Sequence, residues 1–190
     1  LTPIQLSAER LEMKLTGKLQ EPEQLVLNKS VKTIVDQVDA MKRLVNEFRD
    51  YARLPVAELK PLDLNALVQD VMHLYGTENA AVPVYAQLDA SCPIIMGDAQ
   101  QLRQVVHNLL QNAQDATEGQ TNPMVSIATQ WVSTSGRVRL VVRDNGPGFS
   151  IEQSPKGLGM KIINTLVNQL DGKLNIQSKA GVLYTIEFKA

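Results

Sequence analysis

The sequence has little of several residue types that mark specialised classes of protein. Among its 190 residues there is one cysteine, Cys92, and aromatic residues make up only 4%. A single cysteine excludes an internal disulfide and favours a reducing compartment. Lysine and arginine total 19 against 20 aspartate and glutamate, a net charge of −1. Without a basic excess or aromatic residues for stacking, nucleic acid is not expected as a partner.

Long apolar runs are also missing. No run approaches the roughly 20 residues that a membrane-spanning helix needs, and no signal peptide is visible. The hydrophobic fraction of 44% is ordinary for a soluble protein, and the length allows one domain plus a helical appendage. The chain starts in mid-pattern at Leu1, without methionine. We interpret it as a cytoplasmic fragment of a longer protein, in which any membrane attachment lies in segments outside this chain.

The first 54 residues carry two apolar seams at heptad spacing. The first seam consists of Leu1, Ile4, Ala8, Leu11 and Leu15. A turn is expected between Thr16 and Glu23, where Gly17 and Pro22 interrupt the pattern. The second seam ends before Pro55 and consists of Leu27, Val31, Ile34, Val38, Met41, Val45, Phe48 and Ala52. Two antiparallel helices cannot bury both seams alone, so we expect residues 1–54 to form a homodimeric four-helix bundle. A hairpin packed on the rest of its own chain is the alternative.

The remainder alternates between helical and strand-like patterns. Residues 55–60 are interpreted as a linker and residues 61–190 as a second domain. Helices are expected at 62–75, from Asp98 onward and from Gly157 to Leu170, and strands at 82–88, 94–95, 125–132, 137–142, 173–177 and 184–188. This order predicts an α+β fold, an α/β sandwich in which helices lie on one face of a mixed, mostly antiparallel sheet.

The most informative segment follows the strand expected at 137–142. It reads Asp144-Asn145-Gly146-Pro147-Gly148-Phe149, so a lone carboxylate lies at a strand end, directly before two glycines. Such a carboxylate can accept a hydrogen bond from an exocyclic amine, such as N6 of adenine. The glycines let a ring or a phosphate approach the main chain. Taken alone, the segment is also compatible with an ordinary loop.

Two further motifs flank this segment. Upstream, Asn108 and Asn112 are four residues apart and therefore share one face of the helix that Asp98 is expected to cap. Two amides beside an apolar stripe can bind Mg²⁺ and its phosphates through oxygen, and Asn112 is the expected metal ligand. Downstream, glycines at a helix start can expose backbone N–H groups to an anion; the residues of this motif are Lys156, Gly157, Leu158, Gly159 and Met160.

The order of these three motifs resembles the ATP-binding domain of sensor histidine kinases, from the ATPase superfamily shared with gyrase, Hsp90 and MutL. The resemblance covers roughly residues 61–190. The start of the chain is similar to the segment just after the phosphoacceptor motif in nitrogen-regulation kinases of the NtrY type. The resemblance of the three motifs implies ATP and Mg²⁺ as cofactors. It places five residues at the nucleotide, beside the downstream glycine motif: Asn108, Asn112, Asp144, Gly146 and Gly148. It also implies autophosphorylation of a histidine and transfer to a response-regulator aspartate.

The phosphoacceptor histidine is expected upstream of Leu1, so no catalytic residue is assigned within the chain. His73 and His107 are not expected to take that role, because neither lies on the first hairpin helix. Two other functions stay open. An ATP-hydrolysing clamp of the same superfamily is disfavoured, because those relatives carry a glutamate where this chain has Asn108, and an amide cannot take a proton from water. A nucleotide-binding scaffold without kinase activity is the other.

The sequence departs from the family pattern between the two glycine motifs. The resemblance implies a long lid there, but only residues 150–156 separate Phe149 from Gly157. Either the lid is short or lid residues are missing. This departure bears more on contacts to the phosphates than on recognition of adenine.

Overall fold

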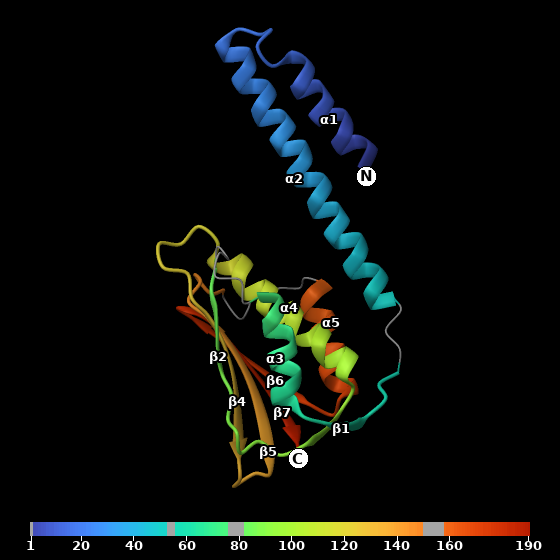
Figure 1. Ribbon diagram of the computed structural model, residues 1–190, viewed down its shortest axis with the longest axis vertical. Coiled ribbons are helices and arrows are strands. Elements are labelled where there is room, and N and C mark those ends of the chain that lie inside the picture. Colours follow the sequence, from blue (N-terminus) through green and yellow to red (C-terminus); the bar gives the residue numbers. More distant parts are fainter. Residues whose placement is uncertain (1, 53–55, 76–81, 150–157) are drawn as a thin grey trace. The chain divides into compact units, whose positions relative to one another are not determined.

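The computed structural model describes residues 2–52, 56–75, 82–149 and 158–190 (Figure 1). The chain divides into two compact units, Leu1–Leu54 and Pro55–Ala190. Within the described ranges, no helix combines the length and the hydrophobicity that a membrane span requires.

The first unit is a helical hairpin. Helix α1 spans Thr2–Leu15 and α2 spans Glu21–Ala52, so the turn lies where Gly17 predicts it. Three residues of the two seams are buried between the helices: Ala8, Val31 and Val38. Val31 and Val38 are seven residues apart on α2, so they lie on one stripe of that helix. The other stripe of the second seam stays exposed, with Ile34 40%, Met41 43% and Phe48 63% accessible.

The second unit is built on a five-stranded sheet of order β2-β4-β5-β7-β6. These strands are β2 Val84–Gln87, β4 Val125–Val132, β5 Arg137–Asp144, β6 Lys173–Lys179 and β7 Gly181–Lys189. Only the β2–β4 pair is parallel; the other three pairs are antiparallel. The predicted mixed, mostly antiparallel sheet is therefore confirmed.

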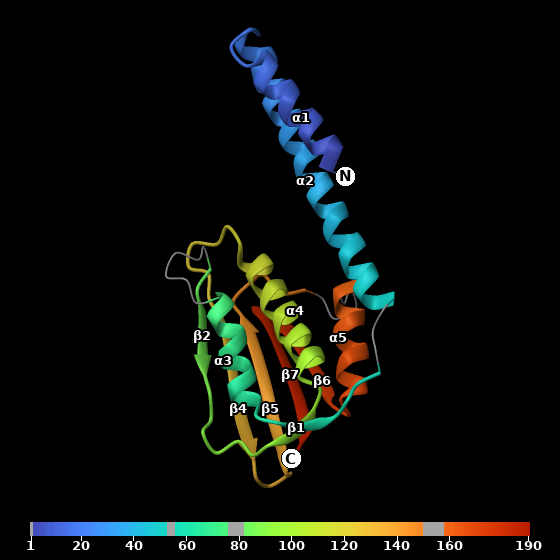
Figure 2. The same ribbon diagram turned by 45° about the vertical axis from the view of Figure 1, so that its right-hand side comes forward.

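Three helices cover one face of this sheet, as Figure 2 shows: α3 Leu64–Tyr75, α4 Ala99–Thr117 and α5 Leu158–Gln169. Alternation along the strands aims every second residue at these helices, and the core forms between them. Its fully buried members include Val105, Leu109, Leu140, Ile163 and Ile186. The predicted cap of α4 is present, because Asp98 Oδ1 accepts hydrogen bonds from the N–H groups of Gln100 and Gln101 at 2.9 and 3.1 Å.

Two expectations about this unit need correction. Lys60–Leu62 is not linker and helix start but a short strand, β1, which pairs antiparallel with β3, Ile95–Gly97. The hydrogen-bonding partner lies over 30 residues away, so local pattern could not reveal the pairing. Strands β5, β6 and β7 also run longer than predicted, since their partners continue to pair beyond the apolar runs.

Candidate functional site

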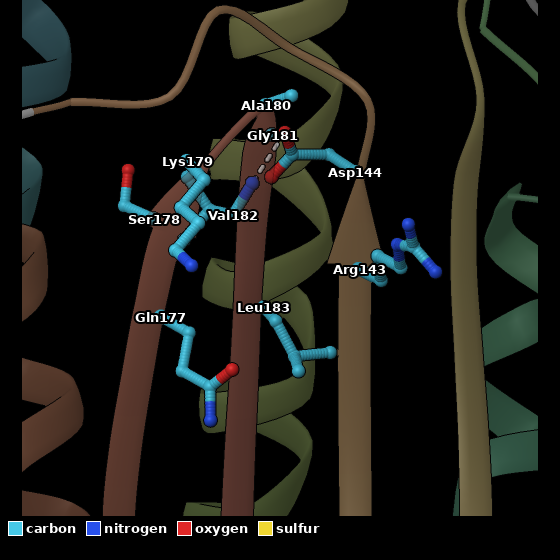
Figure 3. Close-up of a pocket in the computed structure, with 9 residues that line it drawn as sticks. All are labelled: Arg143, Asp144, Gln177, Ser178, Lys179, Ala180, Gly181, Val182 and Leu183. Carbon is cyan, nitrogen blue, oxygen red and sulfur yellow. Dashed lines mark hydrogen bonds between the residues drawn. The ribbon is translucent and has the colours of Figure 1, made fainter.

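Asp144 lies at the end of β5, as its place after the apolar run predicts, and it is 2% exposed. One carboxylate oxygen, Oδ1, accepts hydrogen bonds from the N–H of Gly146 at 2.8 Å and of Val182 at 3.1 Å. The second bond ties the carboxylate to β7 (Figure 3). The other oxygen, Oδ2, makes no hydrogen bond to a described residue. Asp144 is thus held through one oxygen and keeps the other available as an acceptor.

The loop after Asp144 is fixed on both sides by side chains. Asn145 accepts a hydrogen bond from the N–H of Met124 at 2.9 Å and donates to the carbonyl of Asn122 at 2.8 Å. The hydroxyl of Ser178 accepts from the N–H of Phe149 at 2.6 Å and donates to the carbonyl of the same residue at 2.7 Å. The bonds of Asn145 tie the start of the loop to the segment before β4, and those of Ser178 satisfy both backbone groups of Phe149 at its end.

The glycines of this loop are required by close approach. A Cβ added to Gly146 would lie 2.8 Å from the carbonyl oxygen of Ala116, at the end of α4. Gly148 has a φ of +69°, and a Cβ there would lie 2.8 Å from the carbonyl oxygen of Lys179. The loop therefore packs directly against α4 on one side and β6 on the other, which no larger residue would allow.

The contact with Ala116 brings the asparagine pair to the loop. Asn108, Asn112 and Ala116 recur every fourth residue of α4, so they line the same face of the helix. Since Ala116 touches Gly146, this face leads to the glycine loop and to Asp144. Both asparagines are half-buried, and neither side chain makes a hydrogen bond to a described residue. The structure thus brings two of the three predicted motifs together.

The chemistry of this donor set fits a hard divalent cation held jointly with phosphate oxygens. Amide oxygens are hard ligands of the kind that Mg²⁺ accepts. Among the described residues, no group of three or more histidine, cysteine, aspartate or glutamate side chains could hold a metal. A cation at this site would therefore depend on the asparagine amides and on oxygens of the ligand itself.

The third predicted motif is described only in part. Lys156 and Gly157 lie outside the described residues, as does the side chain of Leu158. Gly159 lies in the first turn of α5, and a Cβ there would meet nothing within 4 Å. Met160 is 6% exposed and belongs to the apolar core. The open space at Gly159 agrees with a helix start that a ligand can approach.

Burial shapes the electrostatics of the site. Removal from water raises the pKa of Asp144, although the two N–H donors at Oδ1 oppose the shift. Tyr184 lies on β7 and is 4% exposed. Burial, helped by the nearby Asp144 charge, raises the pKa of Tyr184 to about 12. Keeping this carboxylate away from water lowers the free energy of unfolding, which indicates a functional reason for its position.

Neither histidine adjoins these groups. His73 is exposed in the last turn of α3. His107 lies on α4, where its Nδ1 shares a hydrogen bond of 2.5 Å with the hydroxyl of Tyr75. Their described contacts give no sign of a reactive role.

Sequence reasoning missed the residues that position Asp144. Val182 contributes only a backbone N–H, which carries no sequence signal. Ser178 does carry one: it occupies an inward position of β6, where Leu174 and Ile176 are the preceding inward residues. A hydroxyl side chain at the end of an apolar series indicates that a hydrogen-bonding partner lies on that side of the strand. Asn145 stood within the motif, but its bonds to residues over 20 positions upstream could not be foreseen.

Comparisons with known proteins find relatives for both units of the chain. Residues 97–190 match the family described as "Histidine kinase-, DNA gyrase B-, and HSP90-like ATPase". Over 203 aligned residues, the chain is 27% identical to a putative sensor histidine kinase, NtrY-like, of Rickettsia felis. The alignment covers 99% of this chain and 33% of that protein. The chain thus spans about a third of the length of the curated relatives that it matches first.

Solved structures share the fold. Histidine kinase ThkA, in complex with response regulator protein TrrA, is similar over 95% of this chain and 56% of its own, with a TM-score of 0.69 and 23% identity. Full-length ShkA, in complex with AMPPNP, is similar over 98% of this chain and 43% of its own, with a TM-score of 0.65 and 24% identity.

Proposed function

We propose that the second unit is an ATP-binding domain of the sensor histidine kinase type and that the chain is the catalytic core of such a kinase, which the family match and the NtrY-like relatives support. In this proposal the second unit binds Mg-ATP. In the intact protein, its γ-phosphoryl group would pass to a histidine on the helical hairpin and then to an aspartate of a response regulator. The observation that carries the proposal is the buried Asp144 with one oxygen held and one available.

Asp144 is the residue proposed to read adenine. Its Oδ2 would accept a hydrogen bond from the exocyclic N6 amine, while Gly146 and Val182 hold Oδ1 in place. Guanine has a carbonyl oxygen at the corresponding position, so two acceptors would face each other. The site should therefore prefer adenine over guanine nucleotides.

The asparagine face of α4 is proposed to hold the metal and phosphate end. Asn112 would supply an amide oxygen to Mg²⁺, with Asn108 on the same face. The bound Mg²⁺ would neutralise developing charge on the phosphoryl oxygens. Gly159, with Lys156 and Gly157 outside the described residues, would add N–H groups and a cation at the helix start. The residues of the chain thus orient the nucleotide, while the acceptor histidine would come from elsewhere in the protein.

Partners of the hairpin follow from its exposed stripe. Ile34, Met41 and Phe48 lie seven residues apart on α2 and face away from α1. Covering them by a second copy would give the four-helix bundle expected from the sequence. ThkA is known in complex with a response regulator, which supports such a protein as the downstream partner here.

An ATP-hydrolysing clamp fits less well. Such an enzyme needs a base to activate water, and the amide of Asn108 cannot serve. Asp115 is the nearest carboxylate on α4, one turn beyond Asn112, and its Oδ1 accepts a hydrogen bond from Gln111 at 2.8 Å. A scaffold without catalysis remains the second alternative, and it would bind nucleotide without donating phosphate.

Displacement of a fluorescent ATP analogue tests nucleotide binding directly. The chain should bind the analogue with Mg²⁺ and release it on addition of ATP or ADP, but not of GTP at the same concentration. Equal displacement by GTP would remove Asp144 as the reader of adenine. No binding of the analogue would remove the proposed function itself.

A further inference from the structure

The sheet face that the helices leave open carries most of the positive charge of the second unit. Residues 55–190 contain ten lysines and arginines and twelve aspartates and glutamates. Alternation along β5, β6 and β7 places six of these ten cations on the open face: Arg137, Arg139, Arg143, Lys173, Lys179 and Lys189. Among the acids of the described residues, only Glu187 joins them there. A unit with more acids than bases thus has one strongly basic face.

Most of this charge is uncompensated. Arg139 donates to Glu187 across β5 and β7, with 2.7 Å between Nε and Oε1. The other five cations form no ion pair with a described residue. Like charges gathered without partners repel one another and destabilise a fold. Their concentration on one face is therefore better explained by an external anionic partner than by folding.

The strand register arranges these cations at the two ends of the face. Arg137 lies opposite Lys189 at one end, followed by the row Arg139, Glu187 and Lys173. At the other end, Arg143 lies opposite Leu183, which in turn lies opposite Gln177, and Lys179 follows two residues later on β6. Six residues of strand separate Arg137 from Arg143, which is roughly 20 Å. The row between them is uncharged and consists of Val141, Thr185 and Asn175.

The same face is hollowed. One hollow of about 550 Å³, at the end of the face, is bordered by Arg143, Lys179 and Leu183 and reaches Asp144 (Figure 3). A second of about 530 Å³ is bordered by Lys173, Asn175 and Thr185, among others. Gln177 lines both, so the two hollows adjoin. In Figure 3 the strands lie in front of α4, and the side chains of Gln177 and Leu183 extend over the strands on the near side.

We propose that this open sheet face docks an extended acidic segment of a partner protein. The segment would run along β5, β7 and β6, with carboxylates at its two ends and small or apolar residues at its centre. Its ends would meet the unpaired cations, and the amides of Gln177 and Asn175 would be within the hollows for its main chain. Asp144 lines one end of this surface, whereas Asn108 and Asn112 line neither hollow. The proposal rests on the cations and the strand register, and it is tested without nucleotide.

Concavity decides between an acidic peptide and an anionic bilayer. A bilayer is flat and binds through residues that project from a surface, commonly aromatic ones. Here the cations border hollows, and the central side chains Val141, Leu183 and Thr185 are half-buried rather than projecting. An extended segment can enter such a groove and use both its side chains and its main chain.

Fluorescence anisotropy tests the proposal on the full chain. The probe is a fluorescein-labelled peptide of about ten residues, with two glutamates at each end and a threonine–valine centre. It should bind at low salt and dissociate at high salt, because exposed charges are screened. The paired variant Arg143→Gln with Lys173→Gln should weaken binding about 5- to 30-fold. The matched pair Lys60→Gln with Arg103→Gln removes the same charges elsewhere and should change binding less than about twofold.

Three outcomes would overturn the proposal. The first is no binding of the glutamate peptide at low salt, including the case in which vesicles of phosphatidylserine and phosphatidylcholine sediment the chain instead. The second is equal binding of a peptide with glutamine in place of glutamate. The third is an equal loss in both variant pairs. Circular dichroism of both pairs verifies folding, and Lys173→Gln alone replaces the first pair if that pair unfolds.

Discussion

Replacing Gly146 with alanine tests how the glycine loop joins α4. The new Cβ would lie 2.8 Å from the carbonyl oxygen of Ala116, 2.9 Å from Oδ1 of Asp144 and 3.2 Å from the Cβ of Ala116. The first neighbour is backbone, and Oδ1 is fixed by two hydrogen bonds, so neither can give way freely. The loop or the end of α4 must shift instead.

The size of the effect follows from overpacking. Forcing extra volume into a packed contact costs about 1–3 kcal/mol of unfolding free energy. Reduced freedom of the unfolded chain returns about 0.4–1 kcal/mol, so we expect a net loss of about 1–2 kcal/mol. Displacement of Asp144 should also weaken ADP binding about tenfold.

Gly159→Ala is the matched control for stability alone, because Gly159 belongs to the proposed phosphate end of the site. Its Cβ meets nothing within 4 Å, and the residue lies in the first turn of α5. Helix propensity alone should then stabilise the fold by about 0.5–1 kcal/mol. Urea unfolding of both variants and calorimetry of ADP binding to Gly146→Ala supply the two readouts. The reasoning would be refuted if Gly146→Ala were as stable as the parent chain, or if Gly159→Ala lost more stability than Gly146→Ala.

Three further predictions concern other parts of the account. Asn112→Ala should weaken Mg-ATP binding by at least about tenfold more than metal-free ADP binding, since Asn112 is assigned to the metal; equal losses in calorimetry would remove that assignment. Ile34→Glu should convert a dimer to a monomer in light scattering and leave the hairpin helical. Val38 is 2% exposed, so Val38→Glu should also unfold the hairpin, as measured by circular dichroism. A parent chain that is monomeric at micromolar concentration would count against the bundle. Burial raises the pKa of Tyr184 from 10.0 to about 12. The neutral phenol therefore stabilises the folded state fully below pH 10, and this contribution to the unfolding free energy is lost between pH 10 and about 12. Tyr184→Phe should therefore reduce the alkaline loss of unfolding free energy by about 2–3 kcal/mol, and an unchanged pH profile would show that the phenol is not buried in solution.

Local patterns predicted the elements whose stabilising contacts repeat along the chain. Strand β4 was expected at 125–132 and is found at Val125–Val132, and Asp98 caps α4 as its position before the apolar stripe predicts. Patterns failed where a distant partner decides the structure. Strand β1 contains Pro61 and has only three residues, and it forms because β3 pairs with it.

In the candidate site, too, local spacings predicted some features, whereas contacts between distant segments decided others. The strand-end position of Asp144 and the shared face of Asn108 and Asn112 could be predicted, because both depend on short spacings. That Ala116 touches Gly146, and that Val182 holds Asp144, depends on tertiary packing between segments about 30 or more residues apart. A pattern within one element cannot specify such contacts.

The most direct test of the central claim is calorimetry of ATP and GTP binding to the parent chain and to Asp144→Asn. The substitution keeps the size of the side chain and leaves one oxygen for the N–H groups of Gly146 and Val182. It also removes a desolvated charge, so the fold should be no less stable. Loss of a charged hydrogen bond to adenine should weaken ATP binding by about 1.5–3 kcal/mol, roughly ten- to a hundredfold. The amide can donate to the carbonyl oxygen of guanine, so the preference for ATP over GTP should fall as well. An unchanged ATP affinity and an unchanged preference in a folded Asp144→Asn protein would contradict the account.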